Sequence, residues 1–135
     1  MEPIQTVVAV ITKNKKILMD KRRKDKTVYA GFLMCPSGHV EKDESFESAI
    51  KRELKEELEI DVENCKYLFS IIDVDPTSKK TFKHNFMLIK KYSKDIKKSN
   101  ESRGLVWMGY DEIRILRLPS IVKELIKKLR DKNEL

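Results

Sequence analysis

The chain has 135 residues, 40% hydrophobic and 38% charged, a balance typical of one globular domain spanning residues 1–135. Its 29 basic and 22 acidic residues give a net charge of +7, which suits a polyanionic ligand and favours solubility equally. No apolar run approaches the roughly 18 residues of a membrane span, the N-terminus lacks signal-peptide features, and two cysteines are too few for a disulfide framework. We therefore expect a cytoplasmic protein without a membrane partner.

Short apolar or β-branched runs, separated by polar turns such as KNKK and DPTSKK, predict strands along most of the chain. Two basic segments, residues 21–26 and 90–102, are expected to be loops between strands. The predicted strands are residues 6–12, 17–19, 66–74 and 81–92, with a short one around GLVWM.

The C-terminal segment from Ser120 is expected to form an amphipathic helix. Apolar residues recur at Ile121, Leu125 and Leu129 with lysines between them, a spacing that places the apolar side chains on one helix face. Strands lie on both sides of a second predicted helix near the middle of the chain. The expected fold class is therefore a mixed α/β sandwich.

The central helix is expected to begin at Phe46, with Ser45 as its N-cap. Its apolar residues Ala49, Ile50 and Leu54 recur at the spacing of a single face directed to the core. The opposite face is polar and is expected to be solvated; it carries Ser48, Lys51, Lys55 and Glu59.

Three glutamates of this helix break the usual division into apolar and polar faces. Glu53 and Glu57 occupy positions that continue the apolar face, and Glu56 lies on its flank. A run of charges on a helix is more often a solvated face, but uncompensated carboxylates on a core-facing stripe are costly. Carboxylate oxygens within one turn suit Mg²⁺ or Mn²⁺ rather than zinc. The helix is interpreted as a metal platform.

These residues belong to a longer pattern, GHVEKDESFESAIKRELKEELEI, which begins at Gly38. The pattern resembles the signature of the Nudix hydrolase family, and of its MutT-like members in particular. Glu59 departs from it, because the family has glycine at that position, where a left-handed residue ends the helix. The matching residues are Gly38, Glu44, Arg52, Glu53, Leu54, Glu56, Glu57 and Ile60.

The resemblance implies a Nudix-type α/β/α sandwich with a mixed β-sheet and a divalent cofactor, Mg²⁺ with Mn²⁺ as the alternative. One or more ions would bridge the phosphates of a nucleotide and lower the pKa of a bound water. Glu53, Glu56 and Glu57 would be the metal ligands, and the backbone at Gly38 would approach the metal or a phosphate.

Further roles follow from the same resemblance. Arg52 would clamp Glu44 and order the loop before the helix. Glu101 is the candidate for an additional ligand or the general base. Contacts to the nucleobase would come from Leu33, Met34, Asn100 and Ser120, although Leu33 and Met34 are equally suited to core packing.

The leading functional hypothesis is a Mg²⁺-dependent hydrolase that cleaves nucleoside triphosphates, oxidised or non-standard ones among them, into a monophosphate and pyrophosphate. One alternative substrate is ADP-ribose or another nucleoside diphosphate derivative, because Pro76 lies sixteen residues past Ile60, where such hydrolases often carry proline. A turn explains this proline equally well. Longer polyphosphates or RNA 5′ ends are a further alternative, and no other nucleic-acid partner is expected.

A different class of function is a non-catalytic Nudix module that binds nucleotide or RNA. Such modules typically lose glutamates of the signature, whereas Glu53, Glu56 and Glu57 are retained here. An enzyme is therefore favoured, working as a monomer or a homodimer.

Overall fold

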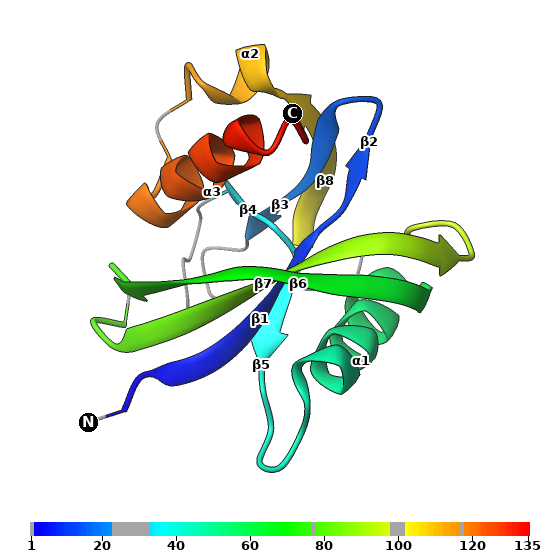
Figure 1. Ribbon diagram of the computed structural model, residues 1–135, viewed down its shortest axis with the longest axis vertical. Coiled ribbons are helices and arrows are strands. Elements are labelled where there is room, and N and C mark those ends of the chain that lie inside the picture. The colour runs from blue at the N-terminus through cyan, green and yellow to red at the C-terminus, as the bar shows by residue number, and fades with distance from the viewer. Residues whose placement is uncertain (1, 23–32, 77, 98–101, 117) are drawn as a thin grey trace.

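The computed structural model describes residues 2–22, 33–76, 78–97, 102–116 and 118–135 (Figure 1). The described residues form eight strands and three helices. In chain order these are β1 (Ile4–Val10), β2 (Thr12–Lys13), β3 (Lys16–Arg22), β4 (Leu33–Met34), β5 (Ser37–His39), α1 (Phe46–Leu58), β6 (Asp61–Val74), β7 (Thr81–Ser93), β8 (Ser102–Gly109), α2 (Tyr110–Ile113) and α3 (Ser120–Asp131).

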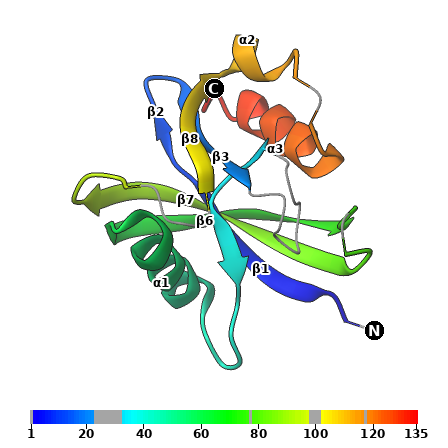
Figure 2. The ribbon, with the colours of Figure 1, turned by 180° about the vertical axis from the view of Figure 1, so that it is seen from behind.

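The strands form two sheets. The first has the order β5-β1-β7-β6 and is mixed, because β1 and β7 run parallel while β5 and β6 pair antiparallel with their neighbours. In the second sheet, β3 pairs with β2, β4 and β8. Figures 1 and 2 show α1 below the first sheet and α3 above it. The predicted α/β/α sandwich with a mixed sheet is confirmed.

The core is divided into two clusters by the first sheet. Val7 and Ala9 of β1 pack with α1, whereas Val8 and Val10 pack with α3. Successive strand residues point to opposite faces, so a strand covered on both faces must be apolar at every position. This requirement explains the uninterrupted run VVAV.

The predicted strands are present, but several of them are longer than expected. The basic segments contribute to the sheets: β3 extends through Arg22, and β7 continues to Ser93. β6 begins at Asp61, where it pairs with Ser93 across the hairpin. Cross-strand pairing overrides the low strand propensity of these polar residues. Residues 23–26 and 98–101 of the predicted loops lie outside the described residues.

The polar segment KNKK forms the predicted turn. Asn14 and Lys15 both have positive φ, 52° and 62°, between the paired residues Lys13 and Lys16. A two-residue hairpin loop with two positive φ angles matches the twist of the flanking strands. The short elements β4, β5 and α2 were not predicted. Each helix in the described part of the chain falls short of the length and apolarity that crossing a bilayer would require.

Candidate active site

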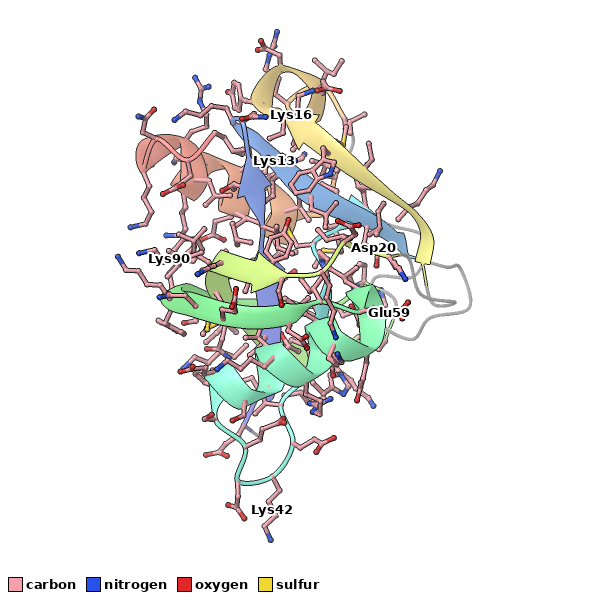
Figure 3. All side chains as sticks on the ribbon, turned by 90° about the vertical axis from the view of Figure 1, so that its right-hand side faces the viewer. Lys13, Lys16, Asp20, Lys42, Glu59 and Lys90 are labelled. Carbon is pink, nitrogen blue, oxygen red and sulfur yellow. The ribbon has the colours of Figure 1, made fainter. Side chains whose placement is uncertain are left out.

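A side-chain cap begins α1 and a residue in the left-handed conformation ends it. The Ser45 hydroxyl accepts a hydrogen bond from the Ser48 backbone N–H at 3.1 Å, which satisfies one of the free donors of the first turn. The helix ends at Glu59, whose φ of 58° and ψ of 33° are left-handed, and there it turns into β6 (Figure 3). The Glu59 N–H donates to the Lys55 carbonyl at 3.2 Å. A non-glycine residue therefore adopts the conformation for which the family uses glycine.

The apolar stripe of α1 fixes the direction of its glutamates. Ala49, Ile50, Leu54 and Leu58 are buried against the first sheet. The side chain of Glu53 is only 13% exposed, Glu57 is half-buried, and the side chain of Glu56 is 60% exposed. The glutamates therefore line the edge of the helix–sheet interface, as the helical spacing predicts, and the predicted solvated residues of the helix are exposed.

Arg52 connects the helix to the loop that precedes it. Its guanidinium donates to both carboxylate oxygens of Glu44, from Nε and from Nη2, at 2.9 Å each. Nη2 also donates to the His39 carbonyl at 3.0 Å. The Glu41 backbone N–H adds a donor to the Glu44 carboxylate at 3.0 Å. Two parallel charge-assisted bonds fix both position and orientation, so the loop from β5 is tied to the middle of α1.

The same guanidinium contacts two of the predicted metal ligands. Nη1 donates to Glu53 Oε1 at 2.7 Å and lies 3.7 Å from Glu56 Oε2. In this arrangement the carboxylates are drawn toward Arg52, and no three His, Cys, Asp or Glu side chains among the described residues converge as a metal site would require. The predicted ligands thus share one edge of α1 without forming a closed ligand cage.

Gly38 on β5 faces the carboxylate of Glu53. A Cβ atom added at Gly38 would overlap that carboxylate group, so any larger residue would displace it. The close approach is maintained by β1, where Val7 pairs with Gly38. Glycine is therefore required at this position for space, and its backbone lies beside a predicted ligand, as the sequence pattern predicts.

The electrostatics of the site centre on the pair formed by Arg52 and Glu44. Hydrogen bonds from the Arg52 side chain, with a smaller contribution from the Glu41 backbone, lower the pKa of Glu44 to about 2. Hydrogen bonding to Glu44 is also the largest cause of the raised pKa of Arg52. Both groups are consequently ionised at neutral pH.

The predicted nucleobase contacts are not gathered at α1. Met34 is 2% exposed and packs in the core cluster on the α3 side of the sheet, with Leu33 partly buried against the same cluster. Burial leaves Met34 almost no surface for a ligand, so the core-packing alternative describes it. Ser120 is exposed at the start of α3. Asn100 and Glu101 lie outside the described residues.

Cys35 is buried in the core cluster on the α3 side of the first sheet, where it packs as a small hydrophobic residue. Burial, and secondarily the charge of Asp20, raises the pKa of its thiol to about 12. The Sγ atom contacts Met19 Sδ at 3.8 Å in the core. A thiol held in the protonated state is a poor nucleophile.

One polar network close to α1 was not predicted. The buried Asn85 side chain on β7 donates to Gln5 Oε1 and the Thr6 carbonyl, each at 2.8 Å, and accepts from the Tyr67 hydroxyl at 3.3 Å. The Tyr67 ring stacks on Phe46, the first residue of α1, with centroids 5.9 Å apart. The available sequence signal was an asparagine directly before the apolar run FMLI.

Comparisons with known proteins agree with this geometry. The sequence model of the whole NUDIX domain family matches residues 2–129 of this chain. The chain belongs to this family. A comparison with curated proteins gives no match. As a Nudix hydrolase, the chain is an enzyme that acts on pyrophosphate bonds, and hydrolases of this family generally use divalent metal ions.

Solved structures share the fold of this Nudix chain at low sequence identity. A MutT protein from Methanosarcina mazei Go1 is 23% identical, with a TM-score of 0.85 over 99% of this chain and 98% of that chain. The E. coli ORF135 protein is 28% identical, with a TM-score of 0.79 over 96% and 92%. The NUDIX domain of Shewanella oneidensis NrtR, solved in complex with ADP ribose, is 16% identical, with a TM-score of 0.76 over 98% and 89%.

The residues of the Nudix signature fit a divalent ion. Glu53, Glu56 and Glu57 supply hard carboxylate oxygens from adjoining turns of one helix. Gly38 leaves the Glu53 carboxylate the space that a side chain would fill. Release of Glu53 from Arg52 and rotation of the exposed Glu56 side chain would direct their oxygens to a common ion.

Proposed function

We propose that this Nudix hydrolase is Mg²⁺-dependent and cleaves nucleoside triphosphates, oxidised or non-standard ones among them, into a nucleoside monophosphate and pyrophosphate. The observation that carries the proposal is the set of three glutamates on the half-buried edge of α1, next to the glycine of β5. All three glutamates that the signature requires on this helix are present, which supports a catalytic role over a purely binding one.

The chain's own residues have distinct parts in this proposal. When bound, Mg²⁺ neutralises phosphate charge and lowers the pKa of a coordinated water. Glu53, Glu56 and Glu57 hold the ion, and Arg52 sets the starting orientation of Glu53 through the 2.7 Å hydrogen bond. Glu101 is proposed as the additional ligand or general base. A Glu101→Gln variant with unchanged turnover would refute that assignment.

Pro76, the residue that suggested ADP-ribose as a substrate, has a structural explanation of its own. This proline occupies the turn between β6 and β7, where the Asp75 side chain accepts from the Ser78 N–H at 2.6 Å. Proline is common in such turns because its φ is already fixed. The turn therefore accounts for Pro76 without a role in substrate choice. Hydrolysis of ADP-ribose by this chain remains the second candidate.

The first experiment separates and quantifies the phosphorylated products of each compound in a substrate panel by ion-exchange chromatography, with Mg²⁺ and, separately, with Mn²⁺. The panel contains the common nucleoside triphosphates, 8-oxo-dGTP, ADP-ribose, diadenosine polyphosphates and an RNA with a 5′ triphosphate. We expect the nucleoside triphosphates to be cleaved to a monophosphate and pyrophosphate, and the other compounds of the panel to be cleaved more slowly. Faster cleavage of ADP-ribose would replace this substrate class with the second candidate.

A Glu57→Gln variant tests the metal platform. Loss of one ligand charge is expected to reduce kcat/KM at least about 100-fold and to weaken Mn²⁺ binding measured by titration calorimetry. Glu47→Gln is the matched control, because Glu47 lies on the same helix and pairs with exposed Lys51 at 3.0 Å. No turnover of any substrate by the unaltered protein would favour the non-catalytic module.

A further inference from the structure

The helices α2 and α3 lie at the end of the molecule opposite α1 (Figures 1 and 2). Their residues, with those of the segment that joins them, line a cleft. Its volume is about 350 Å³, within the range of roughly 300 to 1,000 Å³ typical of small-molecule sites. The signature residues of α1 do not contribute to it. The cleft is lined by Tyr110, Ile113, Arg114, Leu116, Leu118, Lys123, Ile126, Lys127, Arg130 and Asp131.

The floor of the cleft is apolar and held in place by the core. Ile113, Leu118 and Ile126 are buried members of the core cluster on the α3 side of the first sheet. Leu116 is 38% exposed and continues this apolar surface toward the solvent. Because core packing fixes the floor, a bound apolar group would not have to order it first.

The rim of the cleft is cationic, with four basic side chains against one aspartate. Arg130 stacks on the Tyr110 ring, its Cζ 3.8 Å from the centroid, and Arg114 donates to Asp111 at 3.2 Å. Lys123 and Lys127 are exposed on adjoining turns of α3 and form no ion pair with a described residue.

The arrangement of the rim favours a planar anion. A guanidinium stacked on an aromatic ring keeps its N–H donors in its own plane, which matches the geometry of a carboxylate. The lysines supply two additional positive charges at the mouth of the same cleft. An apolar floor beneath such a rim suits a ligand with an apolar body and one acidic end.

We propose that the cleft between α2 and α3 binds a small amphiphilic carboxylate. The apolar body of this ligand lies on Leu116 and Leu118, the aliphatic lining residues with the most exposed surface, above the buried Ile113 and Ile126. Its carboxylate is held by Arg130, Lys123 and Lys127. This binding is independent of the divalent ion and of the hydrolytic reaction, because the signature residues belong to the other end of the molecule.

Decanoate is the probe for this proposal, titrated below its micelle concentration into the full chain labelled at its methyl groups. We expect saturable shifts of the methyl resonances of Ile113, Leu116, Leu118 and Ile126, with or without Mg²⁺. 1-Decanol has the same apolar body without the charge and is expected to bind at least about tenfold more weakly, the ratio that corresponds to two favourable ion contacts.

A double charge reversal, Lys123→Glu with Lys127→Glu, is expected to weaken decanoate binding at least about tenfold. Both positions are exposed, so the fold should be retained. The control carries the same charge change at Lys90 on β7 (Figure 3) and Lys132, which do not line the cleft and are exposed. The control double variant is expected to bind decanoate like the unaltered protein.

Three results would overturn the proposal. These are shifts that do not saturate, equal weakening in both double variants, and equal affinity for decanoate and 1-decanol. If an acidic leucine-rich peptide shifted the same methyl resonances and decanoate did not, the cleft would be assigned to a protein partner instead. Pyrophosphate release is measured in parallel, so a failed hydrolase assay and a failed binding assay remain distinguishable.

Discussion

Arg52 determines how the carboxylates of the signature are arranged. It binds Glu44 through two hydrogen bonds of 2.9 Å and Glu53 through one of 2.7 Å. The bond to Glu44 uses two donors in a fixed plane, whereas the bond to Glu53 uses one. The contact with Glu53 is therefore the easier of the two to exchange for a metal ion, while the contact with Glu44 keeps the loop in place.

The Arg52–Glu44 pair predicts a specific loss of stability in acid. The pKa of Glu44 is about 2 in the folded chain, against roughly 4.3 in an unfolded one. A lowered pKa contributes stability above the unfolded value, and that contribution is lost as pH falls from about 4.5 toward 2. Urea unfolding at pH 7, 4 and 3 should show a smaller acid loss for Glu44→Gln than for the unaltered protein.

The control for this experiment is Glu47→Gln, because Glu47 is paired on the exposed surface of the same helix with Lys51. Its acid loss should follow that of the unaltered protein. An identical pH dependence in Glu44→Gln would mean that the pair with Arg52 does not contribute to stability in this range.

Gly38→Ala is expected to separate activity from stability. The added Cβ would overlap the Glu53 carboxylate, which lies at the end of a flexible side chain and can move aside. We expect kcat/KM to fall at least about tenfold, because displacement of a positioned group by about 1 Å is costly to catalysis. The free energy of unfolding should change by less than about 1 kcal/mol.

Gly104→Ala is the matched control for that substitution. Gly104 lies on β8, and a Cβ there would meet no atom within 4 Å. Its kcat/KM and its unfolding midpoint should stay close to those of the unaltered protein. Equal losses of activity in both variants would contradict a specific steric role for Gly38.

At the scale of elements, the starts of α1 and α3 could be predicted to the residue, whereas α2 and the short strands could not be predicted. α1 begins at Phe46 and α3 at Ser120, as expected, because caps and helical periodicity are local signals. β4 and β5 have two and three residues and exist only through their partners β3 and β1. No local pattern reports a pairing between residues so distant in the chain.

The candidate site likewise has features that the sequence predicted and features that it did not. The half-buried edge of Glu53 and Glu57 follows from the periodicity of one helix and was predicted. The hydrogen bond between Arg52 and Glu53 was not, because adjacent residues of a helix normally point apart. Met34 is equally apolar whether it lines a pocket or the core, so only the structure could place it.

The end of α1 offers a test of backbone strain. Glu59 has a φ of 58°, a conformation that glycine adopts without the steric cost borne by other residues. Glu59→Gly should therefore raise the free energy of unfolding by about 1 kcal/mol, measured by urea denaturation. Glu59→Ala removes the same carboxylate but keeps the Cβ, so it should give no such gain. Equal stabilisation by both variants would indicate a charge effect.

At the scale of the whole molecule, the first sheet separates two functions of the core. The cluster on the α1 side anchors the helix that carries the signature glutamates, whereas the cluster on the α3 side supports the floor of the cleft beside α2. β1 is shared by both clusters, since its alternate residues face opposite layers. The two proposed sites are therefore attached to opposite faces of one rigid sheet.

The net charge of +7 predicts how substrate capture depends on salt. A triphosphate is attracted by the field of the whole protein, and screening shortens the range of that field from about 14 Å at 0.05 M salt to about 6 Å at 0.3 M. We expect KM for the triphosphate to rise several-fold across this range while kcat stays nearly constant, because the chemistry follows capture. ADP-ribose, which carries less negative charge, should show a weaker dependence if it is hydrolysed. A fall in kcat at constant KM would locate the salt effect at the metal site and not in the approach of the substrate.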